Sequence, residues 1–150
     1  MALQRGFRFP VSQAEAFPMG LLLNGQIEAA IKYNPDRNAM PEQLRDYNPK
    51  TNEGTQLLMW KANVTDPHEP KAKRKSFELI FLAEDVPVVT GDELAPGTGL
   101  RMIEVEGLMA EPKVMGQGEF KYQGYQFYAG GIKGDNSRAR NVPAAQKNAA

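Results

Sequence analysis

Five segments of the chain alternate between apolar and polar residues with a period of two, which is typical of strands that bury one face. In the first segment the odd positions from Leu21 to Tyr33 are apolar apart from Gly25, and the even positions include Asn24 and Glu28. No segment of similar length has a helical period. The five segments span residues 21–33, 56–65, 76–83, 101–110 and 120–132. This pattern predicts an all-β protein.

The pattern also predicts where the strands are interrupted. The alternation of the fifth segment changes near Gly124, which indicates a bulge or a tight bend. In the fourth segment, Ile103, Val105, Gly107 and Met109 are expected to face inward. Helix signals are few: residues 12–15 (Ser-Gln-Ala-Glu) fit a capping box and predict one or two helical turns. A second short turn is expected within residues 41–47.

Five short strands without covering helices leave exposed edges unless the sheet curls into a barrel. We therefore expect a small five-stranded OB-like Greek-key barrel with long loops over residues 1–133. A two-sheet sandwich is the main alternative, although it usually requires about seven strands. Residues 134–150 contain almost no large apolar side chains, so this tail is expected to be disordered on its own.

Composition narrows the possible functions of the 150-residue chain. Lys plus Arg number 18 and Asp plus Glu number 18, so the zero net charge excludes a uniformly basic nucleic-acid coat. The chain has no cysteine and one histidine, His68, in a predicted loop. We therefore expect no metal, no cofactor and no enzymatic activity. No apolar run approaches the ~18 residues of a membrane span, and the N-terminus lacks a secretion signal, so we expect a cytoplasmic protein.

Two features of the sequence are candidates for ligand binding, a basic cluster and a run of aromatic residues. Residues 71–75 (Lys-Ala-Lys-Arg-Lys) place four positive charges at a predicted turn between strands. Such a cluster can contact phosphates, or it can be a solvated turn that maintains solubility. The aromatic residues of the last segment are Phe120, Tyr122, Tyr125, Phe127 and Tyr128, with Lys121 and Lys113 near them in sequence.

Nucleobases stack on aromatic rings, while neighbouring cations hold the backbone. About half of these rings must face the core because a strand alternates, and tyrosines are expected to be the exposed ones because the hydroxyl tolerates water. Trp60 shares its alternation with Leu58, Ala62 and Val64, so it belongs either to the core or to a stacking surface.

Four short strings occur in an order that resembles the actinobacterial plasmid replication, integration and excision activator family. They are Phe-Pro-Met-Gly at 17–20, Gly-Gln-Ile-Glu at 25–28, Leu-Met-Trp-Lys-Ala at 58–62 and Ile-Glu-Val-Glu-Gly-Leu at 103–108. The resemblance spans roughly residues 5–132. It implies a role in replication or mobilisation of a plasmid, integrated element or phage in a bacterial host, and it brings no catalytic residues.

Residues 56–132 also resemble bacterial and phage single-stranded DNA-binding proteins in their order of strand, basic loop, strand and Ile-Glu-Val-Glu-Gly strand. Two features depart from that group. No helix is predicted between the third and fourth strands, and the chain ends Lys-Asn-Ala-Ala instead of in an acidic tip that recruits partners. Recruitment of partners through the tail is therefore not expected.

These observations lead to two hypotheses. The first is an OB-like single-stranded DNA-binding protein that acts as a replication accessory. Its expected DNA-binding residues are Lys61, Lys71, Lys73, Arg74, Lys75, Lys113, Lys121, Tyr122, Tyr125 and Tyr128. The second is a regulatory β-barrel that binds a replication initiator or a host replication protein through residues 34–55 without contacting DNA. A dimer or tetramer is expected to form through the long first strand, residues 21–33.

Overall fold

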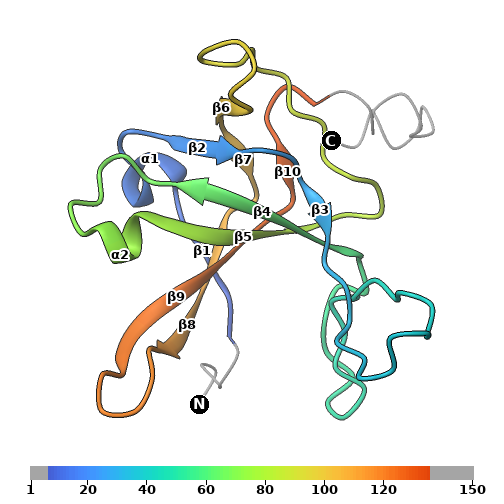
Figure 1. Ribbon diagram of the computed structural model, residues 1–150. Helices are drawn as coiled ribbons and strands as arrows, with labels where there is room; N and C mark the ends of the chain where they lie inside the picture. Colours follow the sequence, from blue (N-terminus) through green and yellow to red (C-terminus); the bar gives the residue numbers. More distant parts are fainter. Residues whose placement is uncertain (1–6, 136–150) are drawn as a thin grey trace.

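The computed structural model describes residues 7–135, apart from the side chain of Lys73 (Figure 1). The fold is mostly β, as the alternation predicts. The helices are α1 (Gln13–Ala16) and α2 (Ala72–Lys75). The strands are β1 (Phe9–Pro10), β2 (Leu21–Asn24), β3 (Glu28–Ala29), β4 (Met59–Thr65), β5 (Ser76–Leu82), β6 (Leu100–Ile103), β7 (Val105–Glu106), β8 (Met109–Met115), β9 (Tyr122–Ala129) and β10 (Gly131–Ile132). The tail expected to be disordered lies, from residue 136 onward, outside the described residues. Within the described part, no helix is long and apolar enough to cross a bilayer.

One large sheet organises the molecule. Its strands follow the order β1-β8-β9-β5-β4-β2-β6, β3 also pairs with β4, and β7 and β10 form a separate pair. All pairings are antiparallel except that of β5 with β9, in which Leu79 lies opposite Phe127. Over residues 7–135 the path ends at β1 and β6, and it does not close on itself.

Glycines divide three of the predicted segments into shorter strands. Gly25, at φ +81°, separates β2 from β3, and Ile31 and Tyr33 beyond them are exposed. Gly107, at φ +64°, reverses the alternation of the fourth segment, so Leu108 is buried. The prediction that Gly107 and Met109 face inward is therefore wrong, because a left-handed residue shifts the side-chain pattern by one position.

The bulge expected near Gly124 is also absent. The pairing of β8 with β9 is continuous from Met109–Tyr128 to Met115–Tyr122. The alternation changes instead at Gly130, since Ala129 and Ile132 on either side of it are both buried. Gly124 is covered by the side chain of Met115, whose sulfur a Cβ at this position would meet.

The first part of the predicted long strand, β2, is paired on both sides. β2 pairs with β4 on one side and with β6 on the other. Both rows of its backbone hydrogen-bonding groups are therefore occupied within the subunit. β2 therefore has no free edge, whereas β3, in the second half of the predicted strand, pairs with β4 alone; association through residues 21–33 stays a prediction.

The helical predictions have mixed outcomes. α1 forms at the capping box, with the Ser12 hydroxyl accepting a 3.4 Å hydrogen bond from the Glu15 backbone N–H. The turn expected at residues 41–47 is wrong, because Gln43 and Arg45 make isolated antiparallel bridges with Ile31 and Leu58. α2 was not predicted, and it lies within the basic cluster itself.

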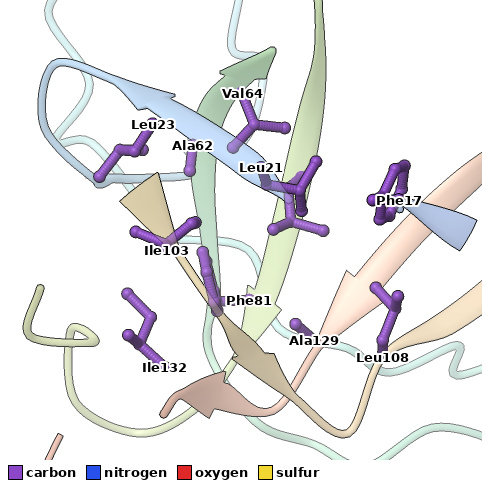
Figure 2. Packing of buried hydrophobic residues seen from close by; sticks show 11 residues of the cluster. Phe17, Leu21, Leu23, Ala62, Val64, Phe81, Ile103, Leu108, Ala129 and Ile132 are labelled. Carbon is purple, nitrogen blue, oxygen red and sulfur yellow. The ribbon is translucent and has the colours of Figure 1, made fainter. Parts of the chain in front are cut away.

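The core lies between one face of the sheet and the segments that cross it (Figure 2). Its buried residues are Phe17, Leu21, Leu23, Ala62, Val64, Leu79, Phe81, Ile103, Leu108, Ala129 and Ile132. Phe17 packs within 5.6 Å of the Phe77 ring and 5.0 Å of the Phe127 ring, measured between centroids. Trp60 packs against this cluster and donates a 2.8 Å hydrogen bond to the Ala83 carbonyl, so it belongs to the core.

Candidate nucleic-acid interface

The side of the main sheet that faces away from the core is here called the outer face. Phe81 and Ala62 point to the core, so their neighbours Ile80 and Lys61, which lie opposite each other, belong to the outer face. Tyr128 is aligned with Ile80 and belongs to the same face. The strand register therefore assigns residues of β4, β5, β9 and β8 to one continuous surface.

The basic cluster and the aromatic strand meet at Arg74 and Tyr122. The guanidinium carbon of Arg74 lies over the Tyr122 ring, 4.7 Å from its centroid. Tyr122 begins β9 and Arg74 lies in α2, directly before β5. β5 pairs with β9 in parallel, so α2, which precedes β5, and the start of β9 lie toward the same end of the sheet. The sheet brings together two features that are far apart in the sequence.

Two other cations of the basic cluster, Lys71 and Lys75, are exposed, and so is Lys121 of the hairpin loop. None of these three lysines has an ion pair among the described residues. The side chain of Lys73 is not described. These unpaired charges are free to contact an anionic ligand.

Lys61 and Lys113 lie on the outer face at different positions. Lys61 is exposed on β4, between Glu28 of β3 and Ile80 of β5. Lys113 lies opposite Gly124, and its ammonium group is 3.7 Å from the Glu111 carboxylate. Lys113 is therefore partly neutralised within the protein, whereas no ion pair involves Lys61 in the described part of the chain.

Tyr128 cannot serve as a stacking surface, contrary to the sequence prediction. Its side chain is only 5% exposed, and the guanidinium carbon of Arg8 lies 3.9 Å from its ring centroid. Burial raises the pKa of Tyr128, although the positive charge of Arg8 opposes the shift. The ring faces outward in the β9 register, and it is buried because the N-terminal segment covers it.

Tyr125 is 45% exposed, but it lies on the opposite face of β9 from Tyr122. Its ring centroid is 6.3 Å from those of Phe9 and Phe127, which continue the aromatic packing of the core. The prediction that the tyrosines gather on one side is therefore wrong, because Tyr122 and Tyr125 are an odd number of residues apart on a regular strand.

The expectation that tyrosines, and not phenylalanines, are the exposed rings of the last segment is also not met. Phe120, in the loop between β8 and β9, is 85% exposed, more than any of the three strand tyrosines. The hairpin loop therefore carries an exposed ring beside the cation Lys121.

Sequence reasoning missed a charged network centred on Arg8. Its guanidinium group makes two 2.8 Å hydrogen bonds to the two carboxylate oxygens of Asp46, and it lies 3.6 Å from Glu111. Thr55 adds hydrogen bonds to Asp46 from its backbone N–H and its hydroxyl. Burial alone would raise the pKa of Asp46, but the hydrogen bonds from Arg8 and Thr55 outweigh it, so the pKa is lowered. The sequence near Arg8 shows only arginines between phenylalanines. It does not indicate that Arg8 pairs with Asp46, 38 residues away.

This network fixes the long segment between β3 and β4. Asp46 is almost completely buried, and backbone hydrogen bonds link it to Leu57 and Gln56. Leu44 is bound to Ala30 and Met59 in the same way. The second half of the segment is therefore attached to the sheet, and Figure 1 shows the whole segment as loops beyond the ends of β3 and β4.

Comparisons with protein-family models, with curated proteins and with solved structures find no match for this chain. The geometry of the chain itself therefore carries the functional argument.

Proposed function

We propose that the chain is a non-enzymatic single-stranded DNA-binding protein with an OB-like barrel, and that it acts as a replication accessory of a mobile element. The observation that carries the binding role is the contact between Arg74 of the basic cluster and the exposed ring of Tyr122. Cations beside an exposed aromatic ring are what a single strand requires, because its phosphates and its bases are both accessible. The role in a mobile element is based on the family resemblance alone.

Strand order supports the barrel. The sheet contains the succession β6-β2-β4-β5, which matches the Greek-key spatial order in which the fourth strand returns beside the first. Residues 100–115 pair with β2 through β6 and with β9 through β8, and so reach both ends of the curved sheet. OB folds are partly open barrels of this kind.

The positions of the cations support a path for single-stranded DNA across the sheet. OB folds bind oligonucleotides on the face of their second and third strands, between the loop after the first strand and the loop before the fifth. In this chain those elements are β4 and β5, the segment 30–58 and the hairpin loop 116–121. Lys61 lies on that face, and Lys121 and Phe120 lie in the hairpin loop.

A fluorescence titration with a labelled oligothymidylate tests the proposal. The logarithm of the affinity is expected to fall linearly with the logarithm of the salt concentration, by about 0.7 for each phosphate contact. The combined substitutions Lys73→Glu, Arg74→Glu and Lys75→Glu are expected to abolish most binding, because they replace attraction with repulsion at the proposed contact.

A matched control changes the net charge outside the proposed path. Lys133→Glu reverses one exposed cation that follows β10, and it is compared with the single reversal Lys75→Glu in the basic cluster. Lys133→Glu is expected to retain more affinity than Lys75→Glu. Equal losses would mean that only net charge matters, and a flat salt titration of the unsubstituted chain would remove the proposal.

One observation favours the second candidate, a regulatory barrel that binds an initiator or host replication protein. The segment 30–58 exposes several large apolar side chains although it is attached to the sheet, namely Ile31, Tyr33, Met40, Leu44 and Tyr47. Exposed apolar groups on an ordered surface are typical of protein interfaces. Under this alternative, charge reversal at residues 73–75 leaves capture of the partner protein intact, and no oligonucleotide is bound at low salt.

A further inference from the structure

We propose that Arg74 and Tyr122 form one composite platform on which a nucleobase stacks, with the base resting on the guanidinium plane and the tyrosine ring beneath it. This inference depends on the DNA-binding function proposed above and specifies how the base is held. It gives Arg74 a role different from that of the neighbouring lysines, which would contact phosphates.

The contacts of Arg74 favour stacking over phosphate binding. Its guanidinium group lies over the Tyr122 ring, and it has no ion pair among the described residues. Arg74 is an exposed residue, which leaves it accessible to a ligand. Planar guanidinium groups stack on bases as well as on aromatic rings.

The platform is held in position before any ligand arrives. Tyr122 is the first residue of β9 and lies opposite Met115 of β8. Arg74 precedes β5, which pairs with β9 in parallel, and its backbone N–H is bound to the Lys71 carbonyl at 3.0 Å. Because both residues are attached to paired strands, little conformational entropy is lost when a base binds.

Lysine cannot replace arginine in this role. A lysine keeps the positive charge and so keeps an electrostatic contact with a phosphate, but it has no planar group on which a base can stack. Arg74→Lys therefore separates the two possible roles of this residue.

The test compares two probes of equal length, about 16 nucleotides. One is an oligothymidylate and the other carries abasic sites, so that it keeps the phosphates and lacks the bases. Arg74→Lys is expected to weaken binding of the oligothymidylate about tenfold, since one stacked base is worth ~1–3 kcal/mol. It should leave the slope of the salt titration unchanged, and it should bind the abasic probe as tightly as the unsubstituted chain does.

Lys75→Ala is the matched control from the same cluster. If Lys75 contacts a phosphate, its removal is expected to reduce the slope of the salt titration by about 0.7. The loss of affinity should then be similar for both probes. If Arg74→Lys binds both probes like the unsubstituted chain, the composite platform is wrong while DNA binding stands. If the unsubstituted chain binds neither probe at low salt, the proposed function fails and this inference fails with it.

Discussion

Arg8 joins three parts of the chain through one guanidinium group. It bonds Asp46 of the segment 30–58, approaches Glu111 of β8 and covers the Tyr128 ring of β9. The Asp46 side chain is 7% exposed and that of Arg8 is 22% exposed, so the pair is largely removed from water. Removing one partner of such a pair leaves an uncompensated charge in the protein.

Substitution Arg8→Met is expected to lower the free energy of unfolding by about 2–3 kcal/mol, because it retains apolar contact with Tyr128 but leaves the Asp46 carboxylate without its partner. Urea unfolding measures the loss. Arg45→Met is the control, since the Arg45–Glu84 pair is half-exposed and such pairs contribute less than about 1 kcal/mol. Similar losses in the two variants would contradict the role assigned to Arg8.

At the scale of elements, the segment 30–58 has a defined conformation that is packed against the rest of the fold. A tight turn at Gly54, where φ is +122°, returns the chain toward Asp46. A Cβ at Gly54 would meet the Asp46 carbonyl oxygen, whereas at Gly97, also at positive φ, it would meet nothing within 4 Å. Gly54 therefore serves both an unusual backbone conformation and a close approach of two backbone segments.

Gly54→Ala is expected to destabilise the protein more than Gly97→Ala. The second variant has only the conformational cost of a left-handed alanine, about 1–2 kcal/mol, while the first adds a collision with backbone that cannot move aside. Amide hydrogen exchange at Leu44 and Asp46 should become faster in Gly54→Ala and remain unchanged in Gly97→Ala. Equal unfolding free energies for the two variants would argue against a tightly packed turn.

At the scale of the whole molecule, the zero net charge conceals an uneven distribution. Exposed cations gather near α2 and the hairpin loop, whereas Glu84, Asp85, Asp92 and Glu93 lie between β5 and β6. Part of that acidic charge is bound internally: the Gly99 backbone N–H donates to Glu93 and lowers its pKa. A neutral chain can therefore still present a locally cationic surface to an anionic ligand.

Global stability is expected to fall in acid through Asp46. Because its pKa in the folded protein lies below its ordinary value of 3.8, the unfolded chain takes up the proton first. The contribution of Asp46 to stability is therefore fully present above about pH 5, and it is lost as the pH falls through 3.8 toward the folded pKa. Urea unfolding between pH 7 and pH 3 should show a steeper decline for the unsubstituted chain than for Asp46→Asn, and parallel curves would contradict the linkage.

Local sequence patterns were sufficient to predict those features that depend on residues close together in the chain. The alternation located strand within all five predicted segments, and the capping box located α1, because both signals depend on residues a few positions apart. The grouping of Phe77, Leu79 and Phe81 toward the core follows from the same alternation.

Contacts between distant residues decided the rest. Tyr128 follows the alternation to the outer face, yet it is buried by Arg8, which is 120 positions away in the printed sequence. Arg74 and Tyr122 come together only because β5 and β9 pair in parallel. The sequence alone determined the all-β class, the five segments in which most of the strands lie, and the presence of a basic cluster and an aromatic run. Which rings are exposed, and which cation meets which ring, depended on the tertiary structure, because burial results from all the segments that pack against a residue.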